Sequence, residues 1–335
     1  MDLAVLETGL GGTWDAVTAV TADATLFTPI DLDHAHILGP TLAHIAKDKA
    51  GAMHPGVPAL CAPQQPEAMR ELEQAAQAKG VALRVTADEP WPQGFTPDDL
   101  GLLGPHQHDN ARLALAAWHL LCGRAGSDAD SGKAPASGAD ITPTPPRPKS
   151  KLTENFPNSD LEVEALRSVR IPGRLQRTIS CPAAQLPAET FLPHPLGRPP
   201  LILDGAHNPH GMAALGRALA LLGVAPAAVI FTCMADKDVE GLVAHLRIAA
   251  VGGPIFVPQL ADNDRAVPAE ELAARIGVNA EAVASVPEAL RRAAEVMAER
   301  LPEAFEDPAT RHPVLVCGSL YLLGEVFALW PELLA

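Results

Sequence analysis

Short apolar runs alternate with helical patterns through most of the chain, and this alternation limits the possible folds more than any other feature. In the second half, apolar runs at residues 201–203, 228–232, 255–257 and 314–317 alternate with helical patterns at roughly 210–222, 239–249, 268–276 and 287–300. Strands separated by helices in this way form a mostly parallel sheet with helices on its faces. The runs at 3–6, 24–30, 58–62 and 83–85, with helices at 42–50, 67–79 and 109–121, predict an earlier α/β domain.

A polar segment separates these two regions. The chain has 335 residues, of which 47% are hydrophobic, and this is enough for two domains with their own cores. Residues 124–165 are rich in Ser, Asp, Gly, Pro and Lys, a composition that cannot build a core and that predicts a disordered linker. We therefore expect domains at residues 1–123 and 166–335, and we expect residues 125–160 to tolerate deletion.

Composition also excludes several classes of protein. A formal net charge of -15 argues against nucleic-acid binding, which depends on neutralising phosphates with Lys and Arg. The five cysteines form no close pair, so neither a disulfide framework nor a zinc knuckle is expected. The uncharged run 218–235 is interrupted by Gly223 and Pro226, and no secretory signal pattern is present. These features predict a cytoplasmic protein without membrane contact.

Polar side chains follow the predicted strands of the first domain. Glu7 follows the run at residues 3–6, and His34 follows the run at 24–30. Ligands of parallel α/β sheets bind at the carboxyl ends of the strands, so these two residues are candidate ligands of a hard cation. Thr41 is expected to cap the helix at 42–50, which carries Lys49. Taken alone, each of the two has only about a one-in-ten chance of binding metal, since a solvated or loop role is commoner.

The second domain places further polar motifs after its strands. The segment from Asp204 to Pro209 leaves a strand and enters a helix, so its backbone amides can meet an anion and Asp204 suits a ribose hydroxyl. Residues 236–238 follow the next strand, and residues 318–322 follow the last, with Ser319 as a candidate cap. A turn or cap explains such short motifs about two times in three, so no single one is decisive.

Taken together, the motifs resemble those of folylpolyglutamate synthase and bifunctional dihydrofolate synthase, within the Mur ligase superfamily. They occur in the order of that family from residue 7 to residue 322. The matching segments are Glu7-Thr-Gly-Leu-Gly-Gly12-Thr-Trp-Asp15, Leu32-Asp-His34 through Lys49-Ala-Gly51, His106-Gln107-His-Asp-Asn110, Pro172-Gly173-Arg174, Asp204-Gly-Ala-His207-Asn208-Pro209, Asp236-Lys237-Asp238 and Gly318-Ser319-Leu-Tyr321-Leu322.

The resemblance implies an enzyme with a particular reaction and fold. It implies an ATP-dependent amide ligase, a cytoplasmic monomer, that adds L-glutamate to dihydropteroate or to a folyl-polyglutamate through an acyl phosphate. It also implies an incomplete Mur-ligase-type central ATPase domain at residues 1–123 and a Rossmann-like, mostly parallel C-terminal domain at 166–335. The implied site residues are Glu7 and His34 for Mg²⁺, Lys49 as a carbamylated lysine acting with His207 in catalysis, Asn110, Arg174, Asp204, Gly205, Ala206 and His207 for ATP, and Trp14, Asp15 and Ala16 for the pterin.

The chain also departs from the family pattern in two places. The family's Gly-Gly-Arg-x-Asp-Ala-Thr-Asn segment becomes Gly-Gly-Thr-Trp-Asp-Ala-Val-Thr at residues 11–18, and its Gly-Thr-Asn-Gly-Lys-Gly-Ser phosphate loop does not occur in the 335 residues. We therefore expect these residues alone to turn over ATP poorly and the first domain to be unstable. Two alternatives stay open: a non-catalytic remnant that acts as a binding module, and a cell-wall Mur ligase acting on nucleotide-linked sugars.

Overall fold

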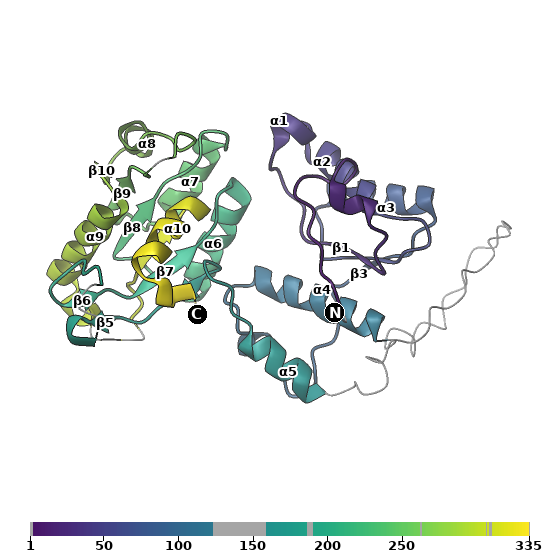
Figure 1. The fold of residues 1–335 in the computed structure, drawn as a ribbon, viewed down its shortest axis with the longest axis horizontal. Helices are drawn as coiled ribbons and strands as arrows, with labels where there is room; N and C mark the ends of the chain where they lie inside the picture. The colour runs from purple at the N-terminus through teal and green to yellow at the C-terminus, as the bar shows by residue number, and fades with distance from the viewer. Residues whose placement is uncertain are drawn as a thin grey trace, which may run out of the picture. The chain divides into compact units, whose positions relative to one another are not determined.

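The computed structural model describes residues 3–122, 159–185, 190–261, 263–305, 307 and 310–334. The chain divides into two compact units, which are described separately (Figure 1). Unit 1 contains residues 1–99 and 108–166, and unit 2 contains residues 100–107 and 167–335. Most of the predicted linker lies outside the described residues. Its end differs from the prediction, because helix α5 (Ser159–Ser168) begins inside the range 124–165, with acidic residues in its first turn and Arg167 in its last.

Unit 1 is built on a three-stranded parallel sheet in the order β1-β2-β3. Alternate residues of the strands face opposite sides: Phe27 and Cys61 pack with α2 and α3, whereas Leu60 packs with α4. Both faces are therefore covered, as parallel sheets require. The elements are β1 (Thr25–Phe27), α1 (Ala35–Leu38), α2 (Leu42–Lys49), β2 (Ala59–Cys61), α3 (Pro66–Lys79), β3 (Leu83–Val85) and α4 (His106–Leu121), with 3-10 turns η1 (Ala16–Ala19), η2 (Ala50–Ala52) and η3 (Pro97–Asp99).

The local signals for helix ends in unit 1 predicted the structure well. The Thr41 hydroxyl accepts a hydrogen bond from the His44 amide and caps α2, as expected. Gly80 ends α3 in the left-handed conformation with φ 62°. Helix α4 begins at His106 rather than at Asp109, so the first turn also contains Gln107.

The predicted strand at residues 3–6 is wrong. These residues form no strand, and Leu3, Val5 and Leu6 are between 51% and 89% exposed. An apolar run becomes a buried strand only where a neighbouring strand pairs with it. Among the described residues, β1 pairs with β2 alone, so residues 3–6 do not pair with the outer edge of β1.

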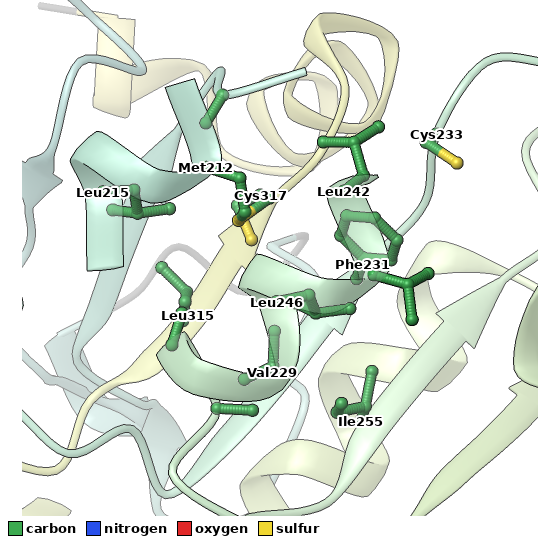
Figure 2. Close-up of a cluster of buried hydrophobic side chains, with 14 of the residues drawn as sticks. Met212, Leu215, Val229, Phe231, Cys233, Leu242, Leu246, Ile255, Leu315 and Cys317 are labelled. Carbon is green, nitrogen blue, oxygen red and sulfur yellow. The ribbon is translucent and has the colours of Figure 1, made fainter. Parts of the chain in front are cut away.

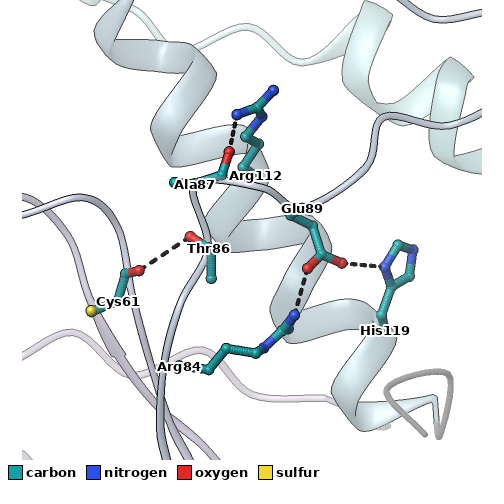
Figure 3. A network of polar contacts seen from close by, with 7 residues as sticks. All are labelled: Cys61, Arg84, Thr86, Ala87, Glu89, Arg112 and His119. Atoms are coloured by element: carbon teal, nitrogen blue, oxygen red, sulfur yellow. Dashed lines mark hydrogen bonds and ion pairs between the residues drawn. The ribbon is translucent and has the colours of Figure 1, made fainter. Parts of the chain in front are cut away.

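A buried polar network joins β3, the loop after it and α4 (Figure 3). One oxygen of Glu89 accepts from Arg84 Nη1 at 2.7 Å, and the other lies 2.6 Å from His119 Nδ1. Arg112 donates to the Ala87 carbonyl in the same region. Glu89 is 6% exposed, and a buried carboxylate is tolerated only with partners of this kind.

Unit 2 contains a six-stranded sheet in the order β10-β9-β8-β11-β7-β4. Its strands are parallel except for β4, which runs antiparallel to β7 at the edge. A separate antiparallel pair is formed by β5 and β6. The strands are β4 (Gln176–Arg177), β5 (Cys181–Pro182), β6 (Gly197–Arg198), β7 (Leu201–Asp204), β8 (Ala228–Phe231), β9 (Ile255–Pro258), β10 (Ala280–Val283) and β11 (Val314–Cys317).

Helices cover both faces of this sheet. Helices α6, α7 and α8 pack on one face against Val229, Phe231 and Leu315, as Figure 2 shows for part of this core. Helices α9 and α10 pack on the other face, against the intervening residues Ile230 and Val316. The helices are α6 (Pro209–Leu221), α7 (Val239–Ala249), α8 (Ala269–Ile276), α9 (Val286–Arg300) and α10 (Leu320–Leu329), with η5 (Ala183–Gln185), η6 (Pro302–Phe305) and η7 (Pro331–Leu334).

The α/β alternation predicted from the sequence is confirmed in unit 2. The four expected strands and four expected helices are present, and Ser319 caps α10 by accepting from the Tyr321 amide. The sequence analysis did not predict β10, whose residues Ala-Glu-Ala-Val are not a continuous apolar run. No helix in the described part of the chain has the length and apolar character needed to cross a membrane.

Candidate functional site

Two of the motifs in unit 2 leave the sheet side by side. Strands β7 and β11 are neighbours, and Asp204 lies opposite Cys317 in their register. The loop at Gly205 therefore starts beside the loop at Gly318. A Cβ placed on Gly205 would lie 2.6 Å from Leu320 Cδ2 and 2.9 Å from Arg174 Nη1. A side chain here would displace Leu320 and Arg174, so glycine allows three motifs that are distant in sequence to approach one another closely.

The Asp204 carboxylate holds these segments together through two hydrogen bonds to backbone amides. Its Oδ2 accepts from the Leu175 amide at 2.7 Å, and its Oδ1 accepts from the Ala206 amide at 2.8 Å. Burial raises the pKa of the Asp204 carboxyl, whereas the two backbone hydrogen bonds and the charges of Arg174 and His207 act in the opposite direction. The carboxylate thus ties the turn at residues 172–174 to the end of β7, a role that the sequence analysis did not assign to it.

Arg174 and His207 carry the polar groups closest to the Gly205 loop. Arg174 is exposed, and its guanidinium lies beside Gly205. His207 Nδ1 lies 2.8 Å from the Gly205 carbonyl oxygen. Since a carbonyl can only accept, Nδ1 is the donor of this hydrogen bond. The site therefore offers a cation and an imidazole next to the start of α6.

The motif at residues 236–238 joins the same edge. Asp238 caps α7 by accepting from the Gly241 amide at 2.9 Å, and a Cβ on Gly241 would lie 2.7 Å from Pro209 Cγ at the start of α6. Arg265 Nη2 lies 3.7 Å from Asp236 Oδ1, and Arg265 Nη1 lies 3.5 Å from the Tyr321 hydroxyl. Sequence reasoning missed Arg265, because it belongs to no motif and its contacts span 29 and 56 residues.

In unit 1, the glycine-rich loop packs against the helix end that carries Lys49. The Gly12 amide donates to Asp48 Oδ1 at 2.9 Å, and the Thr13 amide donates to the Asp48 carbonyl at 3.0 Å. A Cβ on Gly12 would lie 2.5 Å from the Lys49 carbonyl oxygen. Gly12 therefore allows the loop backbone to approach the C-terminal end of α2 closely.

The three residues predicted to contact a pterin lie in the next turn. Asp15 caps η1 by accepting from the Val17 amide, and it also accepts from the Leu10 amide. The Leu10 hydrogen bond is the largest cause that lowers the pKa of the Asp15 carboxyl. Trp14 is 92% exposed, and Ala16 begins η1. Asp15 therefore shapes the loop, while Trp14 offers an uncovered aromatic ring.

The two predicted metal ligands lie on loops of unit 1. Glu7 is exposed, and His34 has a left-handed backbone (φ 53°) with its Nε2 3.9 Å from Asp33 Oδ1. Within the described ranges, no three or more His, Cys, Asp or Glu side chains are grouped so as to hold a metal ion. Mg²⁺ typically uses one or two protein carboxylates and completes its shell with water and phosphate oxygens. Glu7 and His34 therefore stay predicted ligands for a site of that kind.

The predicted ATP-contacting residues fall in both units. Asn110 lies on the part of α4 that belongs to unit 1, whereas Arg174 and residues 204–207 belong to unit 2. Gln107, from the same motif as Asn110, belongs to unit 2 and is 5% exposed. Of these residues, Arg174 and residues 204–207 lie together in unit 2.

Comparison with known proteins gives a consistent picture. Residues 194–320 match the Mur ligase, glutamate ligase domain family. An Arabidopsis thaliana folylpolyglutamate synthase is 32% identical over 225 residues, which is 65% of this chain and 32% of that protein. The dihydrofolate synthase/folylpolyglutamate synthase of Escherichia coli is 28% identical over 338 residues, or 97% of this chain and 64% of that one. The chain therefore spans less than two thirds of the length of these relatives.

Solved structures show the same fold. Mycobacterium tuberculosis folylpolyglutamate synthase complexed with ADP has a TM-score of 0.70 at 22% identity, covering 96% of this chain and 66% of that one. The Escherichia coli protein in complex with DHPP and ADP has a TM-score of 0.64 at 25% identity, covering 98% and 66%. Motif order, the two α/β units and these relatives agree. The chain is therefore similar in sequence and fold to folylpolyglutamate synthases and dihydrofolate synthases, and its residues 194–320 match the Mur ligase, glutamate ligase domain family.

Proposed function

We propose that this protein is an ATP-dependent ligase that joins L-glutamate to dihydropteroate or to a folyl-polyglutamate. The observation that carries the proposal is the convergence of three motifs around Gly205 at one edge of the unit 2 sheet, where the helix that follows residues 236–238 also contacts Pro209. Relatives of known structure contain ADP, and one contains DHPP with ADP, which supports a nucleotide and a folate-type substrate here.

The groups around Gly205 suit a nucleotide phosphate. The start of α6 offers the positive end of a helix dipole, and the exposed Arg174 guanidinium lies beside Gly205 in the segment that leads into this helix. An arginine can bind phosphate oxygens through two parallel hydrogen bonds. In this proposal Arg174 and residues 204–207 of unit 2 hold ATP.

Unit 1 supplies the residues that would bind Mg²⁺ and the pterin in this proposal. Glu7 and His34 would hold Mg²⁺, which when bound neutralises phosphate charge during transfer. Lys49 would carry a carbamate, formed when its neutral amine attacks CO₂ and releases a proton. The Trp14 ring, which is 92% exposed, is a surface on which a flat pterin can stack.

In this proposal the reaction has two steps, formation of an acyl phosphate and formation of an amide. A carboxylate oxygen of the folate-type substrate attacks the γ-phosphorus of ATP and ADP leaves, giving an acyl phosphate. The glutamate amine then attacks the acyl carbon, loses a proton and expels inorganic phosphate. We assign the acceptance of this proton to the imidazole of His207, because histidine is the side chain that most often serves as a general base.

The first test measures nucleotide binding. Arg174→Ala should weaken ADP binding to the 335-residue chain by about 10- to 150-fold in calorimetry, because it removes a charge-assisted contact worth roughly 1.5–3 kcal/mol. Arg217→Ala, on the exposed surface of α6, is the matched control and should bind as the wild type does. Equal affinity in both variants would contradict the assignment of Arg174.

The second test measures glutamate transfer and separates the two acceptors. ADP release and product mass are followed with Mg²⁺, ATP, glutamate and either dihydropteroate or a tetrahydrofolate. No Gly-x-x-x-x-Gly-Lys-Ser/Thr sequence occurs in the 335 residues, so we expect these residues alone to be slow and the same chain joined to a relative's phosphate-loop portion to be fast. The absence of a glutamylated product from the joined chain with both acceptors would refute the proposal.

A further inference from the structure

Lys79 makes an unusual set of contacts at the end of α3. Its Nζ donates to the carbonyl oxygens of Ala50 at 3.3 Å, Gly51 at 2.9 Å and Met53 at 2.8 Å. These carbonyls belong to the turn that directly follows Lys49, where the last carbonyls of a helix lack partners within it. An ammonium has three protons and no lone pair, so one cation satisfies all three carbonyls.

Asp48 fixes the other side of the same helix end. Its carboxylate accepts from the Gly12 amide at 2.9 Å, and its carbonyl accepts from both the amide and the hydroxyl of Thr13, at 3.0 and 2.9 Å. The turn and the loop also touch directly, since a Cβ on Gly51 would lie 2.1 Å from Thr13 Oγ1. The glycine loop, the end of α2 and the turn after it therefore form one packed unit.

We propose that Lys79 and Asp48 are positioning residues for Lys49. Lys79 holds the turn that follows Lys49, and Asp48 holds the glycine loop that lies against its carbonyl, so the backbone from which the Lys49 side chain starts cannot shift. This inference rests on the proposed function, since it matters for catalysis only if Lys49 takes part in the ligase reaction. Lys79 itself touches neither substrate nor metal in this proposal.

The contacts of Lys79 depend on the charged form of its side chain. Burial lowers the pKa of its ammonium, so the fold keeps a cation where desolvation disfavours it. The three carbonyl contacts offset that cost only in the charged form, because a neutral amine has two protons for three acceptors. Lys47, by contrast, is exposed on the same helix as Lys49 and is a matched control for removal of a lysine.

The first measurement is structural and does not require activity. Lys79→Met removes the charge and keeps most of the aliphatic stem. It should speed amide hydrogen exchange at residues 50–54 and 12–13 by about tenfold, while Lys47→Met leaves that exchange unchanged and Lys79→Arg, whose guanidinium can also donate to several carbonyls, restores much of the protection. Unchanged exchange in Lys79→Met would overturn the inference.

The second measurement tests whether loss of the Lys79 or Asp48 contacts impairs the catalytic role of Lys49. In the chain used for glutamate transfer, Lys79→Met should lower kcat by about 10- to 100-fold, in line with the cost of misplacing a catalytic group, with little change in the KM for ATP. Asp48→Ala should act in the same way, and Asp48→Asn, which keeps an acceptor for Gly12, should act less. All assays are run below the thermal midpoint of the least stable variant.

A double variant distinguishes positioning from general destabilisation. If Lys79 acts through Lys49, adding Lys79→Met to Lys49→Ala should cause no further loss of kcat, whereas independent losses that multiply would overturn the inference. The outcome for the proposed function is separate. An inactive wild type would refute that function and this role with it, while an active wild type with an equally active Lys79→Met would overturn this inference alone.

Discussion

At the scale of single residues, the buried thiols have the clearest consequences. Burial raises the pKa of Cys61 to about 11 and that of Cys233 to about 12, and it raises the pKa of Cys317 well above its ordinary value. Because the thiolate is the reactive form, iodoacetamide at about pH 8 should label Cys122 and Cys181 and spare the other three in the native protein. Peptide mass spectrometry checks this. Labelling of Cys317 as fast as Cys181 would contradict it.

The same burial makes stability depend on pH in a defined direction. Between about pH 9 and about pH 11 the unfolded chain loses the Cys61 proton while the native state keeps it. The native state then binds more protons, so the free energy of unfolding falls as pH rises through this window. Cys61→Ala removes the titrating group and should make this fall shallower in urea titrations at several pH values. An equal slope in both proteins would argue against a buried neutral thiol at this position.

At the scale of secondary-structure elements, α6 depends on its cap. Asn208 Oδ1 accepts from the Gly211 amide at 2.8 Å, and Pro209 occupies the first turn. Asn208→Ala should therefore lower the free energy of unfolding by about 0.5–2 kcal/mol in urea titrations followed by circular dichroism. Arg217→Ala, exposed on the same helix, should change it by less than about 0.5 kcal/mol. Equal effects of the two substitutions would show that the cap contributes nothing measurable.

Some contacts between elements could be predicted from the sequence alone, and others could not. The motifs at residues 204–209 and 318–322 could be expected to meet, because the carboxyl ends of neighbouring parallel strands share one edge. The strand expected at residues 3–6 failed because an apolar run does not reveal whether a neighbour will pair with it. The Lys79 contacts span 26 to 29 residues, and no local pattern indicates which carbonyls a lysine near a helix end will reach.

At the scale of the whole molecule, the two units have separate cores. The core of unit 1 is formed by its three-stranded sheet with α2, α3 and α4, and the core of unit 2 by its six-stranded sheet with helices on both faces. The larger sheet of unit 2 buries more apolar side chains in continuous layers. Since burial of apolar area is the main stabilising term, unit 2 should be the more stable of the two.

Unfolding of the chain should therefore occur in two transitions, with unit 1 melting first. Leu72 on α3 and Leu246 on α7 are both completely buried, one in each unit. Leu72→Ala should shift only the first transition in scanning calorimetry, and Leu246→Ala only the second, each by an amount corresponding to roughly 2–5 kcal/mol because a core cavity is created. The double variant should show both shifts unchanged, since the substitutions lie in separate cores. A single transition that both substitutions lower equally would mean that the units unfold as one cooperative body.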